Sequence, residues 1–388
     1  MSVLIEQQPV RTDRAAVIAI ILGVTAFAVA QGLTYPLVTL VLQERGATDA
    51  HIGLNALFYA TGFAIATMGV GRALSAIRGD IVIILALCGC AFSLLAMGVF
   101  GNFWLWCVFR LILGICASTV FIVSEAWLGT ACSDAIRGRI SGLYGAGMCG
   151  GFALGPLAIP LFGTNAAISF AVTAVYVAAI AFLTGLLARN TRTQPHAGSS
   201  THGMFRFIKG SPLLVAMVLA YGLADIAAIS AMPAYLVHAG FSQAFAAAAV
   251  TAVALPTAIS QPLVGALLDR TNRSLVGLAA VAITSIAFFI MPWLESGLAL
   301  LLIFAVVGSS SFALYTCALT LLGERHSGST LVAGSAAFSL SYAVGSAIGS
   351  SSTGLVMTQF SPNAGPLFLA IILGSFAVLY AVIELRRR

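Results

Sequence analysis

Long apolar stretches separated by short polar connections run through the whole chain. Twelve of them have about the twenty apolar residues that a helix needs to cross the hydrocarbon layer of a bilayer. Their approximate limits are 15–42, 50–73, 81–100, 103–130, 140–162, 165–188, 213–238, 244–268, 275–293, 297–322, 330–357 and 365–385. The stretches are continuously apolar rather than alternating, which excludes a transmembrane barrel of β-strands. The pattern predicts an all-α membrane protein with twelve transmembrane helices.

Composition and charge placement fix the orientation of these spans. Charged residues are 8% and hydrophobic residues 60% of the chain, too apolar for one soluble core. The net charge of +6 is not a nucleic-acid signal, because 16 of the 18 basic residues share one side when both termini are cytoplasmic. These residues are Arg11, Arg14, Arg72, Arg78, Arg137, Arg139, Arg189, Arg192, Arg206, Lys209, Arg270, Arg273, Arg325, Arg386, Arg387 and Arg388. Arg45 falls in an outer connection and Arg110 within a span. The positive-inside rule predicts a multi-pass membrane protein with both termini in the cytoplasm and no nucleic-acid partner.

Two local features have simple interpretations. Ala28-Val29-Ala30 resembles a signal-peptidase site, but the apolar stretch continues to Leu42, so we expect a retained first helix. The seven cysteines lie within spans or at their ends and lack the spacing of a zinc site, so we expect small core residues and neither a metal nor a cofactor.

The chain repeats itself after half its length. When it is shifted by 194 residues, six pairs of glycines coincide, where chance predicts about two at the 39-in-388 frequency of glycine. The pairs are Gly46/Gly240, Gly71/Gly265, Gly114/Gly308, Gly129/Gly323, Gly151/Gly345 and Gly155/Gly349. Six spans therefore repeat in the same orientation, as two bundles related by an axis normal to the membrane.

A polar, basic segment rich in turn formers lies between the two sets of six spans, at 189–212. We expect an N-terminal bundle over 1–188, a flexible cytoplasmic linker over 189–212 and a C-terminal bundle over 213–388. Two such bundles can rock about a shared central site, which is the geometry of alternating access.

Three short motifs resemble those of the major facilitator superfamily, and the resemblance in organisation covers essentially the whole chain. Gly265-Ala-Leu-Leu-Asp269-Arg270-Thr-Asn-Arg273 is similar to the family's Gly-x-x-x-Asp-Arg-x-x-Arg cytoplasmic loop. Arg110-Leu-Ile-Leu-Gly114 is similar to its Arg-x-x-x-Gly element in helix 4, and Gly147, Gly151, Gly155 and Pro156 are similar to the Gly-Pro element of its antiporters. The fourfold glycine spacing also suits close helix packing, which we favour.

The stretch Ser124-Glu125-Ala126-Trp127-Leu128 resembles the short bacterial YcaD-like group. Some distant relatives look like riboflavin carriers, so the resemblance allows a riboflavin-like vitamin or an amphipathic metabolite or drug as the solute. The loop after span 2 departs from the family pattern, because Ser75 and Ala76 stand where the Asp-Arg would be. Any charge network that closes the cytoplasmic side should therefore depend on Asp269 and Arg270.

Ionisable residues inside a membrane are costly and indicate function. Asp225 lies about 18 Å along the seventh predicted helix, near the middle of the bilayer. No basic residue accompanies it in that helix, and a carboxyl group removed from water is suited to carry a proton. The resemblance implies that this helix lines the central cavity, so Asp225 is our candidate for proton coupling. The alternative is a structural hydrogen bond to a neighbouring helix.

Arg110 lies about seven residues from the outer end of the fourth predicted helix. A guanidinium stays charged, so it must meet an acid, a carbonyl group or an anionic group of the solute. The family resemblance implies that it faces the cavity. Asp225 is a possible partner, and a tether between the outer helix ends is the alternative role.

Glu125 lies about 22 Å beyond Arg110 along the same helix, so the two side chains cannot touch. We expect it near the cytoplasmic end of the span, within reach of Arg137 and Arg139, in a structural role at the cytoplasmic gate. The full set of gate candidates is Glu125, Arg137, Arg139, Asp269, Arg270 and Arg273.

Polar and aromatic residues within the spans are candidates for the lining of a solute cavity, which is mostly apolar with a few polar groups. They are Gln31, Tyr35, Asn55, Tyr59, Tyr221, Tyr235, Gln261, Tyr315 and Thr316, together with Arg110. Tyr221 and Asp225 lie four residues apart and share a helix face. Each tyrosine could equally be a core or interfacial residue.

Other classes of function lack their signatures. The only lysine is Lys209, so there is no phosphate-binding Gly-Lys-Ser/Thr loop for an ATP-driven pump. No nucleophile motif, aspartate pair or His-Glu-x-x-His indicates an intramembrane protease. A channel does not need the repeat with its linker, and a receptor would usually add soluble domains. We predict a monomeric, non-enzymatic secondary transporter of a small organic solute, coupled to protons, with membrane lipid around it; an uncoupled facilitator or an efflux antiporter is the alternative.

Overall fold

The computed structural model describes residues 12–46, 49–155, 166–191, 193–194 and 201–387, almost all of them in helices. Within these ranges, eleven helices are long and apolar enough to cross a membrane. The span predicted at 140–162 corresponds to α5, which packs against α1 of the N-terminal half and α11 of the C-terminal half. Arg11, Pro156, the end of that span at 156–162, Arg192, the linker residues 195–200 and Arg388 lie outside the described residues.

The helix bounds agree with the predicted spans to within a few residues. In the N-terminal half they are α1 (Arg14–Glu44), α2 (Asp49–Ala76), α3 (Gly79–Val99), α4 (Phe103–Ala131), α5 (Arg137–Leu154) and α7 (Ala166–Ala188). In the C-terminal half they are α9 (Pro212–Ile226), α10 (Met232–His238), α11 (Gln243–Arg270), α12 (Arg273–Ile290), α13 (Gly297–Arg325), α14 (Gly328–Gln359) and α15 (Ala364–Arg387). A π-helical segment, Ala227–Ala231, joins α9 to α10 into one span.

Short polar residues start several of these helices. The side chain of Asn102 accepts hydrogen bonds from the backbone N–H groups of Trp104 and Leu105 at the start of α4. Asn272 does the same at the start of α12, and Ser242 caps α11. These bonds satisfy backbone donors that the first turn of a helix leaves unpaired.

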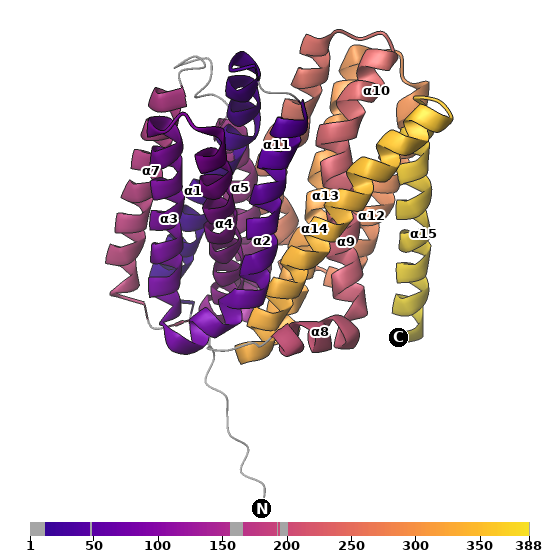
Figure 1. Cartoon of the computed structure of the whole chain (residues 1–388). Coiled ribbons are helices and arrows are strands. Elements are labelled where there is room, and N and C mark those ends of the chain that lie inside the picture. The colour runs from indigo at the N-terminus through magenta and orange to yellow at the C-terminus, as the bar shows by residue number, and fades with distance from the viewer. Residues whose placement is uncertain (1–11, 47–48, 156–165, 192, 195–200, 388) are drawn as a thin grey trace, which may run out of the picture.

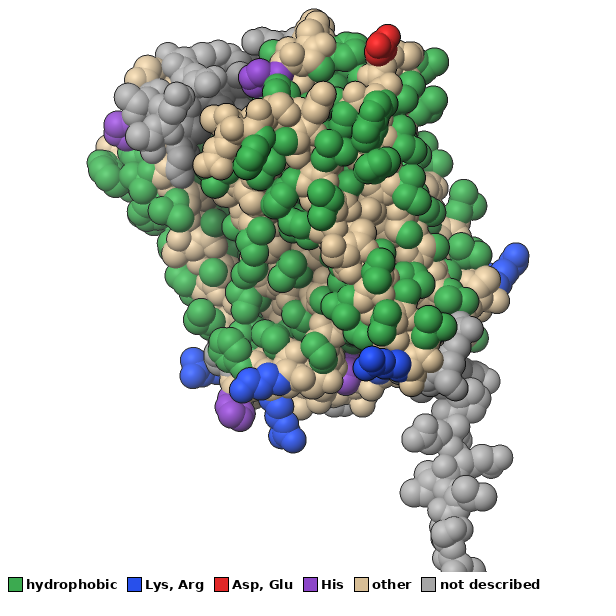
Figure 2. Space-filling view, turned by 90° about the vertical axis from the view of Figure 1, so that its right-hand side faces the viewer, with side chains coloured by type: hydrophobic (Ala, Val, Ile, Leu, Met, Phe, Trp, Pro, Cys, Tyr) green, Lys and Arg blue, Asp and Glu red, His purple; other side chains and the backbone are tan. Residues whose placement is uncertain are grey.

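The outer surface is apolar where lipid would contact it. Leu263, Leu298 and Leu385 are 71%, 70% and 72% exposed, which would be costly in water and is favourable in a bilayer. Figure 2 shows hydrophobic side chains over most of one face, with the visible Lys and Arg side chains toward its lower part. Helix α1 begins and α15 ends at that same lower end (Figure 1), which we call the cytoplasmic end after the positive-inside prediction.

The two halves lie side by side, the N-terminal helices on the left of Figure 1 and the C-terminal helices on the right. Glycines hold equivalent helix pairs together. A Cβ added to Gly114 would collide with the carbonyl oxygen of Tyr59, and one added to Gly308 would collide with that of Val253, which is 194 positions after Tyr59. The same relation links Gly151–Thr25 to Gly345–Leu219, and Gly155–Val29 to Gly349–Leu223. The packing interpretation of these glycines is confirmed, and the two six-helix bundles share one set of close backbone contacts.

The end of the predicted linker is more ordered than its composition suggested. Residues Thr201–Gly210 form helix α8, which lies across the cytoplasmic end in Figure 1. Its buried residue Phe207 packs against Phe338 of α14 and His326, whereas Phe205 is exposed. The spacing of the inward-facing residues Met204, Phe207 and Ile208, at i, i+3 and i+4, is a helical signal that the turn-forming residues before it concealed.

Candidate functional site

The first group of polar side chains lies in the N-terminal half, around Arg110 of α4. Arg110 is 2% exposed, and its guanidinium carbon lies 4.6 Å from the ring centre of Tyr59 and 6.0 Å from that of Tyr35. Among the described residues no carboxylate lies within ion-pair distance of it, and its Nε has no hydrogen-bond partner. A cation–π contact contributes about 0.5–2 kcal/mol. An uncompensated buried ion costs several kcal/mol, so the rings alone do not offset the burial.

Two further polar atoms next to Arg110 lack partners. Asn55 of α2 donates from Nδ2 to the sulfur of Cys107 at 3.7 Å, one helical turn before Arg110, but its Oδ1 is buried without a partner. The hydroxyl of Tyr59, one turn after Asn55, is also buried without a partner. Helices α2 and α4 are in backbone contact at Gly62 and Gly114, so the positions of these side chains are fixed by the scaffold.

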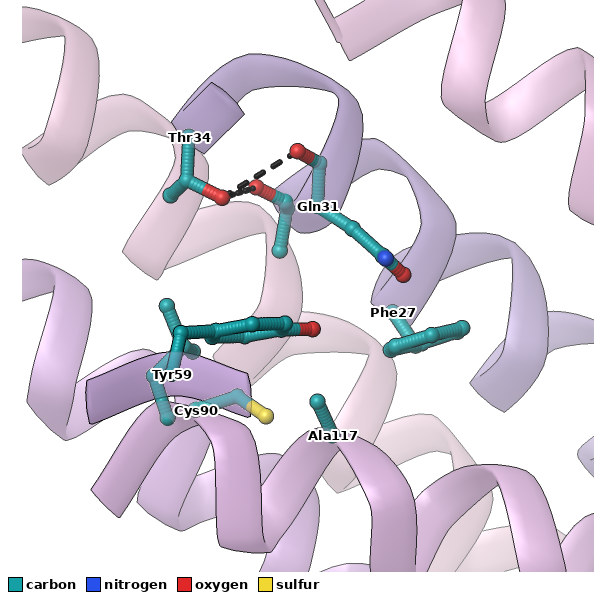
Figure 3. A pocket seen from close by; sticks show the side chains of 8 residues that line it. Phe27, Gln31, Thr34, Tyr59, Cys90 and Ala117 are labelled. Carbon is teal, nitrogen blue, oxygen red and sulfur yellow. Dashed lines mark hydrogen bonds between the residues drawn. The ribbon is translucent and has the colours of Figure 1, made fainter. Parts of the chain in front are cut away.

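Gln31 and Tyr35 of α1 complete this group. The amide nitrogen of Gln31 donates to the Tyr35 hydroxyl at 3.3 Å, and Tyr35 is 42% exposed. Figure 3 shows a small adjacent pocket, in which the hydroxyl of Tyr59 points into the space between Phe27 and Ala117. The predicted candidates Gln31, Tyr35, Tyr59 and Arg110 are thus brought together by three helices.

The second group lies in the C-terminal half, around Asp225. This residue is half-buried at the end of α9, immediately before the π-helical segment. The hydroxyl of Tyr342 of α14 donates to Asp225 Oδ2 at 3.0 Å, and the ring of Tyr342 stacks on Tyr221 with 5.4 Å between centres. π-Helical turns are frequent at functional sites. The considered pairing of Asp225 with Arg110 does not occur, because each side chain faces aromatic residues of its own half.

A series of aromatic rings connects the two groups across the boundary between the halves. Tyr59 contacts Phe63, Phe63 contacts Phe121, Phe121 stacks on Tyr315 at 6.2 Å, and Tyr315 contacts Tyr221 at 5.1 Å. Phe121 and Tyr315 are 194 residues apart, so they are equivalent positions meeting at the pseudo-twofold axis. The aromatic side chains at the centre of the molecule therefore run from the buried cation of Arg110 to the carboxyl group of Asp225.

Glu125 lies in a different environment from the one expected. Its side chain is fully buried, and the hydroxyl of Tyr315, from the other half, donates to its Oε1. Its Oε2 has no partner. No ion pair joins Glu125 to Arg137 or Arg139 in the described chain, because Arg137 pairs with Asp134 and Arg139 lies beside Asp269, whereas the Glu125 side chain points toward Tyr315 of α13.

The remaining predicted lining residues divide into two cases. Gln261 accepts a hydrogen bond from Thr316 at 2.7 Å and donates to the carbonyl oxygen of Ser309 at 3.3 Å, so this pair is satisfied within its own half. Tyr235 is buried in α10 and makes no ring contact or side-chain hydrogen bond with the rest of the described chain. Neither case joins the two central groups.

Charged residues close the cytoplasmic end of the interface. Asp269 of α11 accepts hydrogen bonds from the backbone N–H groups of Gly138 and Arg139 at the start of α5, at 2.6 and 2.9 Å, and lies 3.7 Å from the Arg139 guanidinium. A carboxylate at a helix N-terminus is favourable because unpaired donors and the positive end of the helix dipole lie there. Close glycine contacts between α5 and α11, at Gly138 and Gly265, bring the two halves together here.

Of the remaining gate candidates, only Arg273 forms a hydrogen bond across the interface in the described chain. Arg273 pairs with Glu324 at 2.8 Å and donates across the interface to the carbonyl oxygen of Asp134 at 3.0 Å. Arg137 pairs with Asp134 at 2.7 Å within its own half. Arg270 is exposed and makes no polar side-chain contact with the described residues, so the contacts depend on Asp269 rather than on both residues of the motif.

Sequence reasoning missed Tyr342, Phe63, Phe121 and Phe312. Phe312 contacts Tyr315 and Tyr221 at ring distances of 5.3 and 5.4 Å. The 194-residue shift offered a signal for one of them, since it carries the predicted Tyr315 onto Phe121. Tyr342 carried no such signal, because the shift places it on Met148.

Two similar helical bundles, an apolar outer surface and a polar, aromatic interface between the bundles define a multi-pass membrane transport protein. The chain belongs to the Major Facilitator Superfamily, whose sequence model matches residues 20–350. This membership confirms the resemblance inferred from the three motifs, and the family is one of transporters rather than enzymes.

Individual relatives agree with this assignment. The MFS-type transporter YfkF of Bacillus subtilis is 24% identical over 371 residues, covering 92% of each chain. The MFS-type transporter YcaD of Escherichia coli is 26% identical over 378 residues, covering 95% of each.

Among solved structures, the Escherichia coli fucose:proton symporter FucP matches 96% of this chain and 99% of its own, with a TM-score of 0.79 at 16% identity. The human organic anion transporter MFSD10 matches 95% and 99%, with a TM-score of 0.74 at 17% identity. These two likenesses show the major facilitator fold.

Proposed function

We propose that this transporter moves a small organic solute across the bacterial inner membrane by alternating access, driven by a proton gradient. Asp225 carries the proposal: it is a carboxyl group inside a membrane-spanning helix, with no cation at ion-pair distance in the described chain. Such a group can be protonated and deprotonated as the site opens to either side, because its partner Tyr342 has a hydroxyl that can bond either form.

Two further observations support coupling between the halves. Glu125 of one half is bonded to Tyr315 of the other, so a second carboxyl group lies on the surface that must separate when the cytoplasmic side opens. The ring series from Phe121 through Tyr315 to Tyr221 links that carboxyl group to Asp225. The fold neighbours FucP and XylE are named as proton symporters, which agrees with a proton-driven cycle.

The test uses purified protein in liposomes and a solute found by thermal-stabilisation screening. Asp225→Asn should abolish uptake driven by a pH gradient while keeping solute exchange at equal pH, because an amide cannot carry the proton but leaves the cavity in place. Glu295→Gln is the matched control, since Glu295 is exposed in the connection between α12 and α13.

Full gradient-driven uptake by the Asp225→Asn protein would refute the coupling role. Accumulation by the unaltered protein that never exceeds equilibrium at any pH gradient would instead identify an uncoupled facilitator.

A further inference from the structure

Three neighbouring residues of the N-terminal half each have a buried polar atom that lacks a partner in the described chain. The atoms are Arg110 Nε, the Tyr59 hydroxyl and Asn55 Oδ1, and all three residues are at least 94% buried. A positive charge, a hydroxyl donor and an amide therefore share one region between α2 and α4. Each atom could form a hydrogen bond in water, and none has one here.

We propose that Arg110, Tyr59 and Asn55 form an anion-binding subsite, and that the transported solute is an organic anion with a carboxylate or sulfonate group on an apolar body. The inference rests on the proposed transport function and adds the class of its solute. Arg110 and Tyr59 would donate to the oxyanion, with the guanidinium supplying the charge. Asn55 can accept from a hydroxyl or amide next to that group through Oδ1.

The scaffold holds these donors in place before a solute arrives. A Cβ on Gly62 would collide with the carbonyl oxygen of Leu111, and one on Gly114 with that of Tyr59, so α2 and α4 touch along their backbones on both sides of the site. The Tyr59 ring also fixes the plane of the Arg110 side chain from 4.6 Å. Donors fixed in this way lose little freedom on binding, which favours affinity for a matching group.

The surroundings suit an apolar body attached to that anion. The pocket beside Tyr59 is lined mainly by apolar side chains, including Phe27, Leu113 and Ala117 (Figure 3), and in this structure it has room for little more than one water molecule, so these side chains would have to separate to admit the apolar body. The ring centre of Tyr35 lies 6.0 Å from the Arg110 guanidinium carbon and 6.1 Å from the ring centre of Tyr59, and Tyr35 is 42% exposed, so the cation lies one ring from accessible surface. An inorganic anion would leave these apolar surfaces uncovered.

A purely structural role for Arg110 is the competing explanation. It would require a carbonyl or carboxylate acceptor, as Arg45 shows: that residue also lies 4.6 Å from an aromatic ring, of Trp106, but donates to the carbonyl oxygen of Gly101 at 3.1 Å. Arg110 has the same aromatic contact and no such acceptor among the described residues. Arg45 therefore has the contacts of an arginine with a structural role, whereas Arg110 has a guanidinium that could bind a ligand.

The test measures ligand-dependent thermal unfolding of the purified protein in detergent. The probes are benzoate, naphthalene-2-carboxylate, naphthalene-2-sulfonate and octanoate, each with the neutral amide and the amine of the same skeleton. At least one anion should stabilise the protein more than its amide and amine do. Arg110→Gln should weaken its affinity by about tenfold or more, and Arg45→Gln should leave it unchanged, because a charge-assisted hydrogen bond is lost only in the first.

Tyr59→Phe keeps the proposal testable if Arg110→Gln does not fold, as judged by size-exclusion chromatography. It removes only a hydroxyl without a partner, so the protein should fold and bind the same anion several-fold more weakly. The proposal is overturned if no anion surpasses its amide, or if affinity is unchanged in Arg110→Gln or, where that variant does not fold, in Tyr59→Phe.

Transport in liposomes then separates this inference from the proposed function. If the protein takes up a neutral or cationic solute and none of the anions inhibits that uptake, the proposed transport function stands and the anion-binding subsite is rejected. Specific binding of an anion with no uptake or exchange of it would retain the subsite and reject the proposed function.

Discussion

The two halves of this transporter share a scaffold but not a set of charges. Residues 194 positions apart, which we call repeat mates, make the same backbone contacts at Gly114 and Gly308. The repeat mate of the buried Arg110 is Phe304, and that of Asp225 is Gln31. Arg110 of one half and Asp225 of the other therefore have no charged counterpart at the equivalent position. The repeat accounts for the shared helix packing, whereas the charged residues of the central region lie at positions where the two halves differ.

Glycine substitutions should produce the largest effect and should be equal in the two halves. Gly114→Ala and Gly308→Ala each place a Cβ against a backbone carbonyl, which cannot move away as a flexible side chain could. We expect a loss of about 3 kcal/mol of stability or more in each, measured by thermal unfolding in detergent. Gly354→Ala is the control, because a Cβ there meets nothing within 4 Å and should be tolerated.

If the protein tolerates only one of Gly114→Ala and Gly308→Ala, the two halves are not equivalent in their packing. A large loss in Gly354→Ala would show that helix glycines in general, rather than these close contacts, limit stability.

The cytoplasmic contacts should give the next largest effect, in one half only. Asp269 accepts two backbone hydrogen bonds across the interface, whereas its repeat mate Ser75 bonds only to the carbonyl oxygen of Arg72 in its own helix. Asp269→Asn should cost the closed state about 1.5–3 kcal/mol. That cost changes the ratio of closed to open protein by about tenfold or more. Ser75→Ala should change it little.

The buried thiol of Cys132 at that end reports the opening. Its labelling by a membrane-impermeant maleimide in inside-out vesicles should become about tenfold faster in Asp269→Asn, with the same protein carrying Cys132→Ser as the background. An unchanged rate would mean that the glycine contacts of α5 and α11 hold this end closed without the carboxylate.

The sequence predicted the fold more completely than the site, for physical reasons. A membrane span must be long and apolar, so a run of consecutive apolar residues shows where it lies. The predicted limits of α4 at 103–130 differ from Phe103–Ala131 by one residue. The repeat was also readable, because a glycine at a close helix contact cannot be replaced by a larger residue. Both constraints are local or periodic.

The arrangement of the site depends on which helix faces are opposed, and spacing along one helix does not give this. Tyr221 and Asp225 were correctly placed on one face, but the partner of Asp225 is Tyr342, from a helix 117 residues away. Glu125 was expected to meet Arg137 and Arg139 because they are near in sequence, whereas its side chain meets Tyr315, 190 residues away. Spacing along one helix does not give such contacts between helices, and the 194-residue shift pointed only to the contact of Phe121 with Tyr315.

The smallest expected effect lies where α4 and α13 end, at the repeat mates Cys132 and His326. His326 lies 3.3 Å from the Ser211 hydroxyl and contacts the ring of Phe207 in α8, so it helps to hold that helix against the bundle. Partial burial, and then the charge of Arg325, lower the pKa of His326. The folded state therefore binds fewer protons than the unfolded chain, and stability should fall slightly as the pH drops from about 6.5 through the lowered pKa.

Thermal unfolding at pH 5.5 and 7.5 should show this small difference in stability. His326→Gln should reduce the difference, and Cys132→Ser should leave it in place. If His326→Gln shows the same difference in stability between pH 5.5 and pH 7.5, other groups cause that difference. In that case, the pH sensitivity would not distinguish the C-terminal half from the N-terminal half.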